Sequence, residues 1–166
     1  MDKERHFSSF EPSHPIWWYV VRMGLLSLVP SLLVAVAVVG IWSAFSGLPK
    51  PGPDFADSDT PAVVFFFLLV VITPVVETLL MSAVLWCLSW ITTRPAPLAV
   101  LSAIVWAMLH SSAALPWGLI VAWPFYVFSR AYLAWRPLGW WKAVAVAASI
   151  HGFQNVLPAL AAMAAS

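Results

Sequence analysis

Three apolar stretches of the chain each carry side chains that could take part in acid–base chemistry. Glu77 is a lone charged residue in its stretch, and His110 and His151 follow it in two later stretches. Asn155 comes four residues after His151, which places both side chains on one face of a helix. A carboxylate can act as the general base for a water molecule, and paired donors can stabilise a developing oxyanion. The set of residue types therefore suits the hydrolysis of a peptide bond.

Glu77 lies near the middle of an apolar run, in TPVVETLLM. Charged side chains at the centre of a membrane helix cost about 2.5 to 3.5 kcal/mol on insertion scales, so such a residue needs a reason to be there. The structural alternative is a neutral Glu that hydrogen-bonds a neighbouring helix. Pro74, one turn earlier, removes a backbone hydrogen bond and frees a carbonyl. We expect a kink that opens space for water beside Glu77.

His110 and Gln154 are interpreted from helical periodicity. Trp106 precedes His110 by one turn in WAMLH, so an aromatic wall and an imidazole are expected on one face. By the same periodicity Gln154 points away from His151 and Asn155, and we expect it to hydrogen-bond a neighbouring helix.

The composition indicates the class of protein that must position these residues. Hydrophobic residues make up 62% of the 166 positions, charged residues 9%, and the mean hydropathy is +0.90. These values are typical of an integral membrane protein, for which the lipid bilayer is the first partner. A net charge of +1 gives no indication of nucleic-acid binding, and the single cysteine, Cys87, cannot build a disulfide framework.

The length of the chain predicts an all-α polytopic membrane bundle of about five transmembrane helices. The predicted spans are residues 17–45, 61–91, 97–117, 118–135 and 143–163. We divide the chain into a cytoplasmic N-terminal segment at 1–16, a first transmembrane helix at 17–46 that is retained rather than cleaved, and a core at 61–163. The sequence SSAALPWG after His110 predicts the turn between the third and fourth spans.

Basic residues gather at one end of this arrangement. With the N-terminus in the cytoplasm, the cytoplasmic side receives Lys3, Arg5, Arg22, Arg94, Arg130, Arg136 and Lys142. The loop after the first span, with Asp54, Asp57 and Asp59, then lies outside. The tryptophans are interpreted as membrane anchors, with Trp117 at the outer interface.

The motif around Glu77 resembles the first motif of the CPBP family of intramembrane proteases, also called the CAAX prenyl protease or Abi family. That family carries Glu-Glu-x-x-x-Arg, often after a proline. In PVVETLLMS, Glu77 stands at the leading Glu, Thr78 replaces the second Glu, and Ser82 replaces the Arg.

Two further motifs carry the same resemblance. WAMLH is similar to the family's Phe-x-x-x-His, with Trp106 for the Phe and His110 intact, and HGFQN matches His-x-x-x-Asn through His151 and Asn155. The likeness covers roughly residues 62–160, including a span without catalytic residues as in the family's four-helix core. The first span lies outside it.

The resemblance implies an intramembrane endopeptidase of the glutamic type, a divergent small member of bacterial type in the inner membrane. In that family the leading Glu is the proposed base, so Glu77 with His110 would activate water while His151 and Asn155 hold the oxyanion. The substrate would be a peptide or protein that reaches the site within the membrane, and no cofactor is expected.

Three alternatives stay open at the level of the sequence. The two histidines and one carboxylate could instead bind a divalent metal in a metal-dependent protease. The chain could be a non-catalytic scaffold or immunity protein that keeps the fold and binds a partner. The ionisable residues could also form a proton path in a small transporter.

Overall fold

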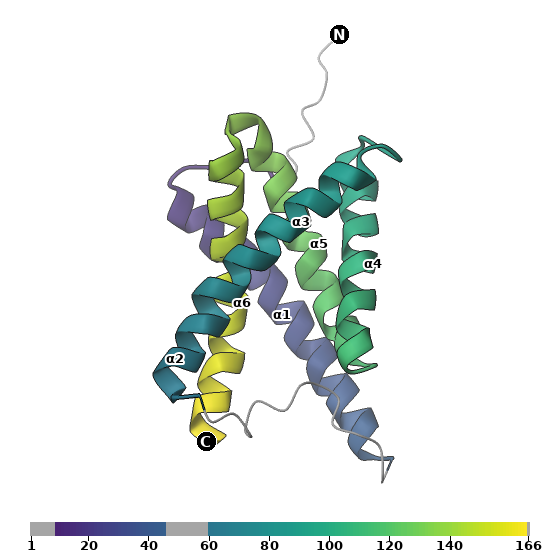
Figure 1. Ribbon diagram of the computed structural model, residues 1–166, viewed down its shortest axis with the longest axis vertical. Helices are drawn as coiled ribbons and strands as arrows, with labels where there is room; N and C mark the ends of the chain where they lie inside the picture. The colour runs from purple at the N-terminus through teal and green to yellow at the C-terminus, as the bar shows by residue number, and fades with distance from the viewer. Residues whose placement is uncertain (1–8, 46–59, 166) are drawn as a thin grey trace.

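The computed structural model describes residues 9–45 and 60–165, and every regular element in these ranges is helical, which confirms the all-α prediction. The predicted acidic loop at 46–59 and residues 1–8 lie outside the described residues. The elements of Figure 1 are α1 (Ile16–Ser43), α2 (Ala62–Phe67), the π-helix η1 (Leu68–Ile72), α3 (Thr73–Leu88), α4 (Pro95–Ala113), α5 (Trp117–Trp135), the 3-10 helix η2 (Arg136–Leu138) and α6 (Trp140–Ala165).

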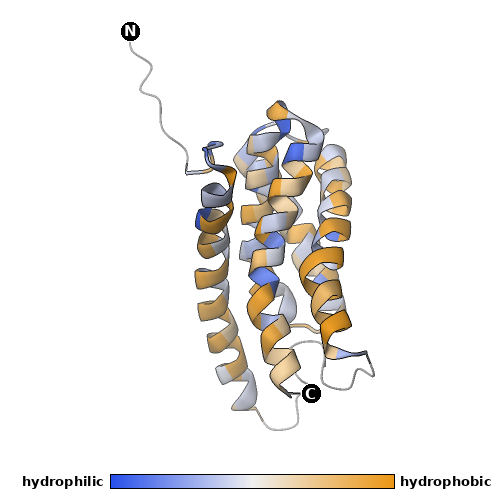
Figure 2. Ribbon diagram, turned by 90° about the vertical axis from the view of Figure 1, so that its left-hand side faces the viewer, coloured by the Kyte–Doolittle hydropathy of each residue, from blue (hydrophilic) through white to orange (hydrophobic). Residues whose placement is uncertain are grey.

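Four helical segments are long and apolar enough to cross a membrane, so the chain is a multi-pass membrane protein. They are Ile16–Ser43, Ala62–Leu88, Pro95–Ala113 and Trp140–Ala164. Figure 2 shows apolar residues along most of the length of the helices. The helix α5 is not among the four, and it carries Arg130 and Tyr126 within its span. Many residues of α5 are buried, because α1, α4 and α6 pack around it.

The helix α5 is the centre of the bundle and contacts α1, α4 and α6. It meets α4 most closely at Gly118, where an added Cβ would run into the backbone carbonyl of Ala107. The continuous stretch from α2 to α3 crosses the bundle diagonally, near α4 at one end and near α6 at the other (Figure 1). Within the described part of the chain, α2 and η1 contact α6 but neither contacts α4 or α5.

A proline in α1 explains one of the contacts between α1 and α5. Pro30 has no N–H, so the carbonyl of Leu26, four residues earlier, lacks its helical donor. The indole N–H of Trp123 on α5 donates to that carbonyl at 2.8 Å. An unpaired backbone carbonyl is costly in lipid, and this contact satisfies it from the neighbouring helix.

The segment before Glu77 is a π-helix rather than a simple kink. The backbone N–H of Thr73 donates to the carbonyl of Leu68, five residues earlier, and Pro74 comes next without any N–H. The carbonyl of Leu69 therefore receives no helical bond from residues 73 or 74. The prediction that Pro74 frees a carbonyl beside the site is confirmed, and the π-helix is the form that the irregularity takes.

The two ends of the bundle differ in charge. The start of α1, the turn from α3 to α4 and the turn from α5 to α6 lie at the end where the chain begins (Figure 1). Arg22, Arg94, Arg136 and Lys142 belong to these segments. The opposite end holds the α4–α5 turn and the C-terminal end of α6, and its described residues contain no Lys, Arg, Asp or Glu.

Candidate functional site

The four residues singled out in the sequence line one internal cavity. Glu77 reaches it from α3, His110 from the last turn of α4, and His151 and Asn155 from α6. The cavity has a volume of about 320 Å³, within the range of sites that hold small ligands. Residues separated by more than seventy positions of sequence thus meet at one place, which their spacing alone does not require.

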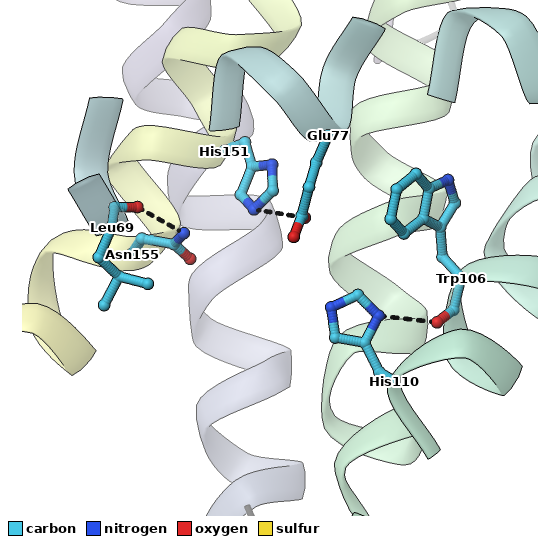
Figure 3. Close-up of polar contacts among 6 residues, drawn as sticks. All are labelled: Leu69, Glu77, Trp106, His110, His151 and Asn155. Carbon is cyan, nitrogen blue, oxygen red and sulfur yellow. Dashed lines mark hydrogen bonds and ion pairs between the residues drawn. The ribbon is translucent and has the colours of Figure 1, made fainter. Parts of the chain in front are cut away.

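The carboxylate of Glu77 faces the imidazole of His151. Their nearest atoms, Oε2 and Nε2, are 3.6 Å apart, which suits an ion pair with a protonated ring but is longer than a hydrogen bond (Figure 3). The side chain of His151 is 7% exposed and that of Glu77 is 22% exposed. Phe128 stacks on the His151 ring at 4.6 Å, and Phe125 meets its edge at 5.5 Å. Two aromatic rings from α5 therefore fix the plane in which His151 faces the carboxylate.

His110 is oriented by its own helix. Its Nδ1 lies 2.8 Å from the carbonyl oxygen of Trp106, and because a carbonyl can only accept, Nδ1 carries the hydrogen. The other ring nitrogen, Nε2, lies on the side of the ring that faces Glu77 in Figure 3. Trp106 does share a face with His110 as predicted, with ring centroids 5.9 Å apart. In a neutral ring Nε2 is an acceptor, so it can bind a water or a donor in the cavity.

Trp117, predicted as an outer-interface anchor, also has a place in the site. It lines the cavity, and its ring meets the edge of the His110 ring at 4.6 Å. The turn between α4 and α5 is short, so the first residue of α5 folds back against the last turn of α4. This tryptophan therefore belongs to the wall of the site.

Asn155 is bound to the irregular segment before Glu77. Its Nδ2 donates to the carbonyl oxygen of Leu69 at 2.9 Å, the acceptor that η1 and Pro74 leave without a helical bond (Figure 3). Gly152 lies one turn earlier on α6, where an added Cβ would be 2.6 Å from the carbonyl oxygen of Val70. The bond to Leu69 uses one of the two hydrogens of the Asn155 amide, and the second is left for the cavity.

Gln154 makes the interhelical hydrogen bonds that were predicted, but it does not point away from the site. Its amide bonds Ser27 and Ser31 of α1, and the residue also lines the cavity. The predicted direction was wrong in that Gln154 still lines the cavity, at a part of α6 that contacts both α1 and η1.

The two departures from the first motif lie outside the cavity. The hydroxyl of Thr78 is buried and has no hydrogen-bond partner among the described residues. The hydroxyl of Ser82 donates to the carbonyl of Leu79 on its own helix at 2.7 Å. Neither residue lines the cavity, so the polar groups there are those of the four predicted residues with Gln154 and Thr73.

A metal ligand set is not assembled in this arrangement. Within residues 9–45 and 60–165 no group of three or more His, Cys, Asp and Glu side chains is placed so that it could hold a metal ion. Glu77 and His151 form a pair, while Nδ1 of His110 bonds the Trp106 carbonyl of its own helix.

The fold and the cavity together define a multi-pass helical membrane protein with a carboxylate, two imidazoles and a carboxamide around one internal site. Compared with family models, with curated proteins and with solved structures, the chain matches none.

Proposed function

We propose that the protein is an intramembrane endopeptidase in which Glu77 activates the attacking water. The observation that carries the proposal is the convergence of Glu77, His110, His151 and Asn155, from three different helices, on one partly enclosed cavity. A purely structural polar network would satisfy its members with one another. Here the carboxylate of Glu77 has only His151 nearby, and Nε2 of His110 has no hydrogen-bond partner among the described residues, although both residues line the cavity.

The reaction begins with a water held between the Glu77 carboxylate and Nε2 of His110. Glu77 takes a proton from the water as the oxygen attacks the carbonyl carbon of the scissile peptide bond. The carbonyl oxygen becomes an oxyanion, and Nε2–H of His151 and the second Nδ2 hydrogen of Asn155 stabilise it. Glu77 then delivers the proton to the departing amine nitrogen as the C–N bond breaks.

The substrate is a membrane-associated peptide segment with apolar side chains. Apart from its polar groups the cavity is walled by apolar and aromatic residues, among them Phe125, Phe128 and Trp117.

The resemblance to the CPBP family supports the same assignment. Its leading Glu, its two histidines and its Asn correspond to the residues that line the cavity, and the residues that replace its second Glu and its Arg lie outside the cavity. We place the protein as a divergent bacterial-type member in the inner membrane with its N-terminus in the cytoplasm. The altered first motif favours a substrate other than a prenylated CAAX terminus.

The test is cleavage of membrane-inserted peptides by the purified protein in liposomes. We expect Glu77→Gln and His151→Ala to abolish cleavage, whereas Ser43→Ala, a matched change on α1 where the hydroxyl bonds its own helix, leaves it intact. Activity that survives a chelator supports the glutamic mechanism, and activity that the chelator removes selects a metal-dependent protease. A folded wild type that cleaves nothing, with full cellular function in Glu77→Gln, would instead select a binding protein.

A further inference from the structure

We infer that Gln154 is a positioning residue, clamped by Ser27 and Ser31 of α1, which sets the rotation of α6 and thereby the placement of His151 and Asn155 in the cavity. The consequence for turnover rests on the proposed function, whereas the positional effect does not. Through this clamp α1, which lies outside the resemblance to known proteases, helps to position the residues of the site.

The clamp satisfies both ends of one amide. The hydroxyl of Ser27 donates to Oε1 of Gln154 at 2.9 Å, and Nε2 of Gln154 donates to the hydroxyl of Ser31 at 2.7 Å. Ser27 is fully buried and Ser31 is 2% exposed, so lipid and water do not compete for these groups. The two serines are one helical turn apart, which gives the amide two fixed points along the axis of α1.

The backbone of α6 is weakened at the same residue. Pro158 has no N–H, so the carbonyl of Gln154, four residues earlier, loses its helical donor. This is the turn that carries Asn155, and His151 is one turn before it. The backbone carbonyl of Gln154 thus loses one hydrogen bond, while its side chain makes two hydrogen bonds to α1. The clamp therefore supports α6 at the point where its own hydrogen bonding is incomplete.

Close packing contacts hold α6 on two sides. On the side of η1, Gly152 lies close to the carbonyl of Val70, and on the side of α1 the ring of Phe153 lies where a Cβ on Gly24 would be 2.5 Å from it. Packing at these two contacts limits translation, while the bonds of Gln154 resist turning about the helix axis.

A small rotation would be enough to misplace the reacting groups. Turning α6 by about 10° moves an atom about 6 Å from the axis by about 1 Å, and a misplacement of about 1 Å can cost a factor of about 100 in rate. His151 and Asn155 would move together, because both belong to α6. Losing the clamp should therefore lower kcat much more than it changes KM.

The experiment separates an effect through α1 from a direct contact of Gln154 with the substrate. Ser27 and Ser31 do not line the cavity, whereas Gln154 does. We expect Ser27→Ala/Ser31→Ala and Gln154→Leu each to lower kcat by about 10-fold to 100-fold with KM changed less than about 2-fold. Ser43→Ala is the matched control on α1 and should behave as wild type. Loss of activity in Gln154→Leu alone would overturn the inference and make Gln154 a substrate contact.

A second readout does not need proteolysis. The ¹⁵N chemical shifts of the His151 ring, recorded by NMR in lipid nanodiscs, report the tautomer and hydrogen bonding of the ring, which depend on its contact with Glu77. We expect them to change in Ser27→Ala/Ser31→Ala and to stay at the wild-type values in Ser43→Ala. Unchanged shifts in the double variant would overturn the inference. Changed shifts in a protein that cleaves nothing would support the clamp while the proposed protease function fails.

Discussion

Asn155 donates its side-chain hydrogen bond to the carbonyl of Leu69, the backbone group that the π-helix and Pro74 leave without a helical donor. A residue predicted for chemistry thus also closes a gap in the backbone of a neighbouring helix. The bond ties α6 to the segment that leads directly into α3 and Glu77. The proposed base and the proposed oxyanion donor are therefore mechanically connected.

Replacing Asn155 by Leu tests both roles. We expect the loss of the bond to Leu69 to lower the free energy of unfolding by about 1 kcal/mol, in the range of interhelical hydrogen bonds in membranes. Removing an oxyanion donor should lower kcat by a factor of about 100 to 1,000. Unfolding in a denaturing detergent and cleavage assays on the folded fraction measure the two effects separately. A fall in cleavage no larger than the fall in folded protein would leave Asn155 with a structural role alone.

Gly152→Ala tests the approach of α6 to η1. The added methyl group would be 2.6 Å from the carbonyl oxygen of Val70, a backbone atom that cannot move without shifting η1. We expect a lower unfolding temperature, from overpacking that costs about 1 to 3 kcal/mol. Gly40→Ala is the matched control, because nothing lies within 4 Å of its Cβ position, and it should be neutral or slightly stabilising. Equal effects of the two changes would contradict the close contact.

Trp123 and Pro30 should be energetically coupled through the carbonyl of Leu26. Trp123→Phe removes the indole donor at 2.8 Å and should destabilise the protein by about 1 kcal/mol. Pro30→Ala restores a helical N–H for the same carbonyl, so the cost of Trp123→Phe should fall by about 0.5 kcal/mol or more in that background. A double-mutant cycle of unfolding free energies measures the coupling. Additive effects would show that the indole and the missing N–H are unrelated.

The proposed orientation is tested with reporter fusions. With the basic end of the bundle in the cytoplasm, alkaline phosphatase fused after Ser166 should be active, and green fluorescent protein at the same place should stay dark. Fusions at the N-terminus should give the opposite pattern. A fluorescent C-terminal fusion would invert the proposed orientation.

Hydropathy and turn residues were sufficient to predict the helices. The fourth predicted span, 118–135, differs from α5 by one residue, because Pro116 and the short turn define its start. The predicted ends were less accurate. The helix α6, for example, begins at Trp140 rather than at residue 143. Glu77, His110, His151 and Asn155 could be selected because polar side chains in apolar helices are rare.

Two features of the site could not be predicted from the sequence, and a third could be predicted only in part. Trp117 is as apolar as any interfacial tryptophan, and its contact with His110 depends on the geometry of the α4–α5 turn. The partners of Gln154 are more than 120 positions away, and nothing local identifies them. The acceptor of Asn155 was foreseeable in part, since Pro74 predicts a free carbonyl nearby.

The π-helix η1 also has a consequence for comparing this protein with relatives. A π turn holds one residue more than the α turn it replaces, so deleting one residue from Leu68–Ile72 would let α2 run into α3 as a regular helix. Because the π turn takes up the extra residue within a single turn, the deletion would leave α2 close to its present orientation relative to Glu77. A homologue without the extra residue would still align with this chain around Glu77. Its residues before η1 would be out of register by one position unless the alignment placed a one-residue gap there. The extra residue thus changes the backbone locally, at the carbonyl of Leu69 that Asn155 binds.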